Sequence, residues 1–426
     1  MDRHDLEAFR YPKFRRVWGA GVMSQLGDWM QVYGRGILAY ALTGNAGSVG
    51  LVVFFTYLPQ LLFNFYPGVF ADRFDRRRLF LVTQVAQATG AAILAVLVAT
   101  DRATMFWICT IAFVMGFALV IAIPAEQALA PQVVPRGALS SAISLSAATN
   151  SLCRVFGPLL AAGVFALGGL GWVFAVNALS FSGVILVWLF TRVPPNPEME
   201  EATNTAALVE GVRYVRRTAR VWIPIAIAGF LGSVGVVYQP MSPVYAHEVL
   251  APHSTSLGDA YNGWIQAAIG TGAAVGILGL AGVGRRRPGA TLVVSAVLFS
   301  IALIALGFVT APVVALPLLA VLGGLQFANM ALAINLVQHE VPEVLRGRVM
   351  AVQMMTLIGF VPVAALVGGL LADRVGIGTV FAGAGVICLV FSLFALRWIP
   401  RLHGMALGAR SDETTMAVTH VMDEES

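Results

Sequence analysis

Three ionisable residues, Asp28, Arg35 and Arg154, lie inside long apolar stretches of this 426-residue chain. A charged side chain at the centre of a bilayer costs about 2.5–3.5 kcal/mol on insertion scales, so such residues usually have a function. Loss of water favours the neutral form of a carboxyl group, whereas a neighbouring guanidinium favours its charged form. These residues are therefore candidates for proton coupling or for contact with a charged substrate.

Their spacing predicts where the three side chains point. Residues three or four apart share a face of a helix, so the first helix has one polar face that we expect to line a cavity. Its members are Gly21, Gln25, Asp28, Gln31 and Arg35. A rise of about 1.5 Å per residue places Arg154 between Asp28 and Arg35 in depth. We expect Asp28 to pair with Arg154 and Arg35 to stand free near the outer end; alternatively, the pair only fixes the helices.

Composition indicates that lipid surrounds these residues. Charged residues make up 12% of the chain and hydrophobic residues 58%, against about 25% charged residues in an average soluble domain. So few charges cannot cover a soluble protein of this length. The composition therefore predicts an all-α integral membrane protein and excludes a disordered chain, a coiled coil and a soluble enzyme.

Twelve apolar stretches have the length of about 20 residues that a helix needs to cross a bilayer. We expect transmembrane helices at 17–42, 47–71, 79–99, 104–127, 139–165, 168–191, 221–247, 260–283, 290–310, 313–338, 348–372 and 377–398.

Basic residues are distributed very unequally among the connecting segments. Twenty-three lysines and arginines fall on one side of the predicted bundle, and only Arg102 and Arg374 fall on the other. Because basic loops stay in the cytoplasm, we expect both termini there and the protein in a bacterial plasma (inner) membrane. The net charge of +5 thus reflects orientation and does not indicate a nucleic-acid partner.

Two sequence features recur at an offset of about half the chain. A glycine before an arginine cluster recurs at Gly68 and Gly276, and Val134-Pro135 recurs as Val341-Pro342, with offsets of 208 and 207 residues. Repeated halves are typical of transporters that bind substrate at the repeat interface. The predicted division is a cytoplasmic tail at 1–16, a six-helix half at 17–191, a linker at 192–220, a six-helix half at 221–398 and an acidic, disordered tail at 399–426.

The linker is predicted to contain an amphipathic helix. Val212 and Val215 are assigned to one face and Arg213 and Arg217 to another. Such a helix lies along the inner membrane surface; the alternative is a solvated linker helix.

Amide and aromatic side chains in several spans are the candidates for a cavity wall. A wall with few fixed charges suits a large amphiphile better than a sugar or an inorganic ion. The alternative is that these side chains only pack together or face lipid. The candidates are Gln25, Gln31, Tyr57, Gln60, Asn64, Phe113, Tyr238, Gln239, Gln326 and Asn329.

The segment Gly68–Arg78 (GVFADRFDRRR) resembles the signature between spans 2 and 3 of the major facilitator superfamily. Ser24–Trp29 (SQLGDW) and Arg346–Arg348 (RGR) resemble the subgroup of siderophore (enterobactin-type), macrolide and drug exporters. The resemblance implies a fold of two six-helix halves with spans 1, 4, 7 and 10 around a central cavity. The chain departs from the proton–drug antiporters in lacking an arginine in the middle of span 4.

The resemblance also implies roles for residues at the inner helix ends. Asp72, with Gly68, Arg73 and Arg77, would form an inner latch between the halves. Glu126 is either a carboxylate that reaches the membrane surface or a gate partner of the Arg76–Arg78 cluster.

Other helix-end and helix-bend residues are interpreted from their types alone. We expect Asp373 and Arg374 to form a local ion pair at the outer end of span 11. Gly157, Pro158 and Pro362 are predicted to bend spans 5 and 11.

The function predicted from the sequence is export of an amphiphilic small molecule by alternating access, with protons as the exchanged ion. An uptake symporter, a facilitator or a lipid transporter is the alternative, and a membrane scaffold or sensor fits the polar face of span 1 poorly. No metal-ligand cluster, phosphate-binding loop or nucleophile motif occurs in the sequence. We therefore expect a monomer that is not an enzyme and that uses a proton gradient in place of a cofactor.

Overall fold

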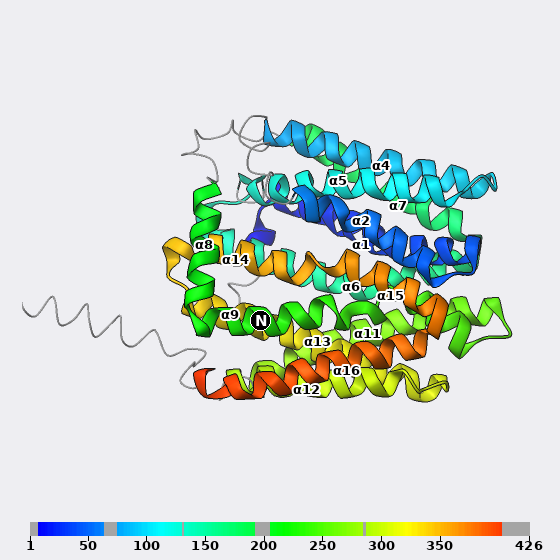
Figure 1. Cartoon of the computed structure of the whole chain (residues 1–426). Helices are drawn as coiled ribbons and strands as arrows, with labels where there is room; N and C mark the ends of the chain where they lie inside the picture. The colour runs from blue at the N-terminus through cyan, green and yellow to red at the C-terminus, as the bar shows by residue number, and fades with distance from the viewer. Residues whose placement is uncertain (1–6, 64–74, 130–131, 192–204, 284–286, 403–426) are drawn as a thin grey trace, which may run out of the picture.

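The structure is a computed structural model that describes residues 7–63, 75–129, 132–191, 205–283 and 287–402. The described residues form helices and connecting turns, and the long helices run side by side as one bundle (Figure 1). Six membrane-spanning segments precede the linker helix α8, and six follow it, as predicted.

The N-terminal half begins with a helix that proline starts and glycine ends. Pro12 occupies the first position of α1, and Gly44, at φ +67°, closes its last turn. At the start of α4, Asp75 caps the helix by accepting a hydrogen bond of 2.8 Å from the backbone N–H of Arg78. The helices of this half are α1 (Pro12–Thr43), α2 (Ala46–Phe63), α4 (Arg76–Ala99), α5 (Met105–Leu129), α6 (Leu139–Gly168) and α7 (Leu170–Phe190).

The C-terminal half contains four continuous spans and two interrupted ones. Its segments are α9 (Ala219–Ser233), η4 (Gly235–Tyr238), α10 (Ser242–Tyr245), η5 (Ala246–Leu250), α11 (Thr255–Val283), α12 (Pro288–Leu306), α13 (Pro312–Glu340), α14 (Glu343–Ile358), α15 (Val361–Val375), α16 (Ile377–Ala395) and η6 (Leu396–Leu402). The linker helix α8 (Thr205–Arg217) crosses one end of the bundle (Figure 1). We call this end the α8 end and the opposite end the far end.

Hydropathy separates the spans into two groups. In the described part of the chain, nine helical segments are long and apolar enough to cross a membrane by themselves. The other three spans are α1, α6 and α11, which carry Asp28, Arg154 and Asn262. These three spans are therefore the ones in which polar side chains interrupt the apolar surface that a lipid-facing helix needs.

Two spans that the sequence predicted as continuous helices are broken. The span predicted at 221–247 leaves α-helical geometry after Ser233, and the span at 348–372 breaks between Ile358 and Val361. Pro240 and Pro243 lie in the first break and Pro362 follows the second. A proline ring removes a backbone donor and clashes with the preceding turn, which interrupts a helix while leaving its hydropathy high.

The two halves approach most closely toward the far end. There α2 packs against α15, and α6 packs against α11. A Cβ atom built on Gly50 would lie 2.4 Å from the carbonyl oxygen of Ala365, and one built on Gly369 would lie 2.6 Å from the carbonyl oxygen of Ala46. Glycine is therefore required on both sides of this contact, where one backbone lies directly on the other.

Candidate functional site

The polar centre of the molecule is a hydrogen-bonded network that joins the two halves. Arg154 of α6 donates from Nη2 to the Oε1 atom of Gln239 at 3.4 Å. The amide of Gln239 donates to Oε1 of Gln326 on α13 at 2.8 Å. The hydroxyl of Tyr238 donates to the same oxygen at 2.7 Å. Four residues singled out from the sequence are therefore brought together.

The network includes the break in the first span of the C-terminal half. Tyr238 ends the short helix η4, and Gln239 follows it directly. Broken helices in transporters place polar groups at mid-membrane depth, where they can contact a substrate. The sequence identified these two residues by type, but the break that positions them was missed.

Aromatic rings from both halves enclose the guanidinium of Arg154. Its Cζ atom lies 4.8 Å from the ring centre of Trp29 on α1 and 4.1 Å from that of Phe327 on α13. Contacts of this kind are worth about 0.5–2 kcal/mol each, depending on how far they are removed from water. Trp29 and Phe327 were not among the predicted site residues, although each directly follows one, Asp28 and Gln326, and an aromatic residue at such a place is a usable signal.

The predicted ion pair between Asp28 and Arg154 is wrong for this conformation. No such pair occurs among the described residues; Arg154 contacts aromatic rings and Gln239 instead. The charged groups that act on Asp28 are Arg35 on its own helix and Glu126 on α5. The prediction compared only the depths of Asp28 and Arg154 in the membrane. A similar depth does not determine the direction in which each side chain points.

Arg35 is enclosed by protein, and its exposed fraction is 7%. Within the described residues, its Nε and Nη1 atoms have no hydrogen-bond partner. Tyr57 of α2 interacts electrostatically with both Arg35 and Arg154. Asp28 and Arg35 therefore act on each other electrostatically, and the predicted cavity residue Tyr57 acts on each of the two arginines.

Two predicted cavity residues instead fix helices within one half. Gln31 donates to the Met115 sulfur at 3.0 Å and accepts a hydrogen bond from Asn177. Asn329 donates to the Leu292 carbonyl oxygen at 2.7 Å and to the Ser295 hydroxyl at 2.8 Å. Both amides form buried hydrogen bonds between neighbouring helices of one half. The position of a residue on a helical face does not distinguish this role from that of a cavity residue.

The remaining predicted cavity residues are half-buried or lie outside the description. Gln25 is half-buried, and its Oε1 atom has no partner among the described residues. Gln60 and Phe113 are half-buried on α2 and α5, and their role in a cavity stays a prediction. Asn64 lies outside the described residues.

The predicted inner latch falls mostly outside the described part of the chain, which omits Gly68, Asp72 and Arg73. Arg77 is described, and it donates from Nε to the Trp188 carbonyl oxygen at 2.9 Å and from Nη2 to the Leu189 carbonyl oxygen at 2.7 Å. It therefore caps the end of α7 within its own half, where its charge also complements the helix dipole.

The remaining predictions concern a gate residue and three helix bends. Glu126, in the last turn of α5, is exposed and acts electrostatically on Asp28. Gly157 lets α6 approach α1, since a Cβ atom there would lie 2.4 Å from Cβ of Trp29. Pro158 lies inside the uninterrupted helix α6, whereas Pro362 follows the break before α15.

A contact at the far end was assigned wrongly from the sequence. Asp373 was expected to pair with Arg374, but its carboxylate accepts hydrogen bonds across the two halves. The backbone N–H of Ala46 donates to Oδ1 at 2.6 Å, and that of Gly47 donates to Oδ2 at 2.9 Å. A carboxylate at the beginning of α2 satisfies free N–H groups and meets the positive end of the helix dipole. The repeat of Asp72-Arg73 as Asp373-Arg374 was the available signal.

Two further hydrogen bonds join the halves at the far end. The Tyr40 hydroxyl donates to Glu248 Oε1 at 3.4 Å, and the Tyr33 hydroxyl donates to the backbone oxygen of Asp259 at 3.3 Å. These two bonds, the two that Asp373 accepts and the Arg154 network all connect the N-terminal half with the C-terminal half. The contacts of Asp373 and the two tyrosines therefore hold the halves together at the far end in this conformation.

Replacing Asp373 with asparagine is expected to open the far end more often. The loss of an anion at a helix N-terminus costs about 0.3–2 kcal/mol, which converts to a shift of about 2- to 30-fold in the closed-to-open ratio. Reactivity of a cysteine at Ala46, which is 1% exposed in this conformation, toward a membrane-impermeant thiol reagent measures the shift. Arg374→Gln, next to it in sequence, is the matched control and should leave reactivity unchanged; equal reactivity of wild type and Asp373→Asn would contradict the latch.

Comparison with known proteins agrees with this architecture. The family model described as transmembrane secretion effector matches residues 4–425. The staphyloferrin A transporter of Staphylococcus aureus is 25% identical over 378 residues, which cover 87% of this chain and 92% of that protein. The enterobactin exporter EntS of Escherichia coli is 25% identical over 374 residues, which cover 85% of each chain.

Solved structures support the fold. The nucleoside transporter NupG superposes with a TM-score of 0.72 at 13% identity and covers 92% of this chain and 99% of its own. A bacterial homologue of the lysosomal transporter Spinster, in an inward-facing and unoccupied conformation, gives a TM-score of 0.70 at 14% identity, over 92% and 98% of the two chains. The chain thus belongs to the transmembrane secretion effector family, whose members are transporters of the major facilitator superfamily.

Proposed function

We propose that this protein exports an amphiphilic small molecule of siderophore or drug type across a bacterial inner membrane, in exchange for protons. The observation that carries the proposal is the Arg154 network, since one half-buried cation contacts side chains of both halves at the repeat interface. A substrate that engages this cation can change how the halves are joined, which alternating access requires. The names of the staphyloferrin A and enterobactin relatives support the siderophore class.

The chemistry around Arg154 favours a ligand that is both anionic and aromatic. A planar guanidinium binds carboxylate or phenolate oxygens in a bidentate manner, and the rings of Trp29 and Phe327 offer stacking surfaces beside it. The amides of Gln239 and Gln326 add hydrogen-bonding groups of both kinds. This set suits carboxylate or catecholate siderophores better than a sugar, which would need more hydrogen-bonding groups and no fixed cation.

The closed far end supports the loading state of an exporter. Basic residues concentrate in the segments of the α8 end, which the positive-inside tendency assigns to the cytoplasm together with both termini. In that orientation Asp373 and the two tyrosines close the outer side. The Arg154 network would then receive its substrate from the cytoplasm.

Asp28 is the proposed proton carrier. Its carboxyl group lies near one cation and one further acid, Arg35 and Glu126. A movement that changes its distance from Arg35 changes how strongly it binds a proton. Outward movement of substrate and inward movement of protons would be coupled through this exchange.

The test is proton-gradient-driven uptake of radiolabelled siderophores and lipophilic drugs into inverted membrane vesicles, with wild type beside Asp28→Asn. The neutral variant cannot release a proton, so we expect gradient-driven transport to fall at least about 10-fold while substrate binding is retained. Asp101→Asn is the matched control, because Asp101 is an exposed turn residue whose positive φ asparagine also tolerates.

Two results would overturn the proposal. A transport rate that changes neither with the proton gradient nor with the Asp28 substitution would identify a facilitator. Gradient-driven movement in the opposite direction only would identify an uptake symporter.

A further inference from the structure

The linker helix α8 is fixed to the C-terminal half along one of its faces. Gly211 and Val215 are buried there, and a Cβ atom on Gly211 would lie 3.1 Å from the backbone of Arg348 on α14. Arg348 forms an ion pair with Glu210, and beyond the end of α8 Arg220 pairs with Glu340 at 3.6 Å. The helix is therefore a docked part of this half and lies across the end of the bundle (Figure 1).

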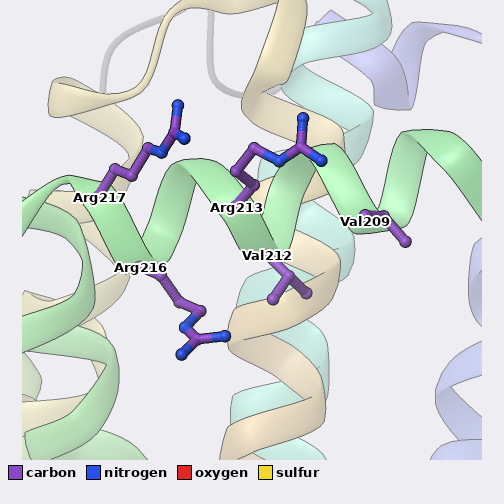
Figure 2. Close-up of a pocket in the computed structure, with 5 residues that line it drawn as sticks. All are labelled: Val209, Val212, Arg213, Arg216 and Arg217. Carbon is purple, nitrogen blue, oxygen red and sulfur yellow. The ribbon is translucent and has the colours of Figure 1, made fainter.

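The opposite face of α8 is a stripe without a protein partner among the described residues. Spacings of three and four residues place Val209, Val212, Arg213, Arg216 and Arg217 together around a shallow hollow of about 350 Å³. Figure 2 shows Arg213 and Arg217 pointing to one side of the helix axis, and Val212 and Arg216 pointing to the other. The valines are 56% and 41% exposed, and none of the three arginines forms an ion pair with a described acid. The linker prediction had assigned Val212 to the same face as Val215, whereas here Val212 lies with the arginines.

We propose that this stripe binds the headgroup of an anionic phospholipid of the membrane leaflet at the α8 end, with the phosphate between the arginines and an acyl chain against Val209 and Val212. Three cations with no described counter-ion complement a negative headgroup. Exposed valines beside them match the boundary between headgroup and acyl chain, where an arginine keeps its stem in the apolar layer and its charge at the phosphate. A soluble anion would leave the valines exposed to water.

The bound lipid would act on the C-terminal half of the molecule. Because Glu210 of α8 pairs with Arg348 of α14, a headgroup held by the stripe ties the C-terminal half to the membrane surface at the α8 end. This inference concerns lipid binding alone and does not depend on which substrate is carried.

The experiment titrates purified full-length protein in neutral detergent with short-chain dioctanoyl-phosphatidylglycerol and follows the bound lipid by native mass spectrometry. We compare wild type with the triple variant Arg213→Gln, Arg216→Gln, Arg217→Gln. The matched control removes three charges elsewhere at exposed positions of α1, through Lys13→Gln, Arg15→Gln and Arg16→Gln. The α8 variant should bind the lipid at least about 10-fold more weakly than wild type, and the control should bind as wild type does.

Two companion titrations keep the result independent of folding. Raising the salt concentration from 50 to 500 mM should weaken binding to wild type, because exposed charges are screened. Dioctanoyl-phosphatidylcholine should bind at least about 10-fold more weakly than the anionic lipid. Equal binding to wild type and the α8 variant, equal binding of both lipids, or displacement of the lipid by inorganic phosphate at a similar concentration would overturn the proposal, the last result indicating a soluble phosphate ligand.

Discussion

Replacing Arg154 with glutamine is expected to reduce transport about 100-fold while the protein stays folded. The substitution removes a charged hydrogen bond to Gln239 and the contacts with the rings of Trp29 and Phe327. A hydrogen bond to a charged group is worth about 1.5–3 kcal/mol, and each aromatic contact adds about 0.5–2 kcal/mol. Since about 1.4 kcal/mol is a factor of ten, the lower ends of these ranges, about 2.5 kcal/mol together, correspond to a loss of about two orders of magnitude.

The measurement is the initial rate of transport in proteoliposomes, with the thermal unfolding midpoint as a check on folding. Arg154→Lys is the informative control, because lysine keeps the charge and loses the planar fork that binds two groups at once. Its rate should lie between those of wild type and Arg154→Gln. A folded glutamine variant that transports at the wild-type rate would remove Arg154 from the site.

Replacing Gly50 with alanine is expected to shift the protein away from the closed far end. The new methyl group would lie 2.4 Å from the carbonyl oxygen of Ala365, so α2 and α15 must move apart. Overpacking of this kind costs about 1–3 kcal/mol, equivalent to a change of about 5- to 150-fold in the closed-to-open ratio.

Spin labels at Asn45 and Arg374, both exposed, report the separation by pulsed electron resonance. Gly369→Ala should have the same effect from the other side of the contact, because its Cβ atom would lie 2.6 Å from the carbonyl oxygen of Ala46. Gly183→Ala is the control, because nothing lies within 4 Å of a Cβ atom there. If Gly50→Ala and Gly183→Ala gave the same distance distribution, backbone contact between α2 and α15 would not control closure.

The number and order of the membrane spans could be predicted from the sequence because hydropathy and length determine them directly. The interruption near Pro240 was missed, and near Pro362 only a bend was predicted, because hydropathy stays high across both interrupted segments. A hydropathy window averages over residues and does not respond to the loss of individual backbone hydrogen bonds. Proline lies at or next to both breaks, but Pro158 and Pro317 lie inside continuous helices, so proline alone does not identify a break.

The sequence predicted which residue types form the candidate site better than it predicted which residues each of them contacts. Arg154, Gln239 and Gln326 were singled out as polar groups in lipid, and the structure joins them. Gln31 and Asn329 looked equivalent in sequence, yet they form hydrogen bonds inside one half. Helical periodicity assigns a face to a side chain, but the identity of the neighbouring helix is a tertiary property that one sequence does not specify.

The contact of Asp373 with α2 has an evolutionary consequence. Its donors are the main-chain N–H groups of Ala46 and Gly47, which nearly every amino acid supplies. The position opposite the acid therefore carries no requirement for a complementary side chain. A Cβ atom on Gly47 would lie 2.6 Å from the carboxylate. The residue at this position must therefore be small, but it needs no particular functional group. Methods that find contacts through correlated substitutions would overlook this contact, although it connects residues 327 positions apart.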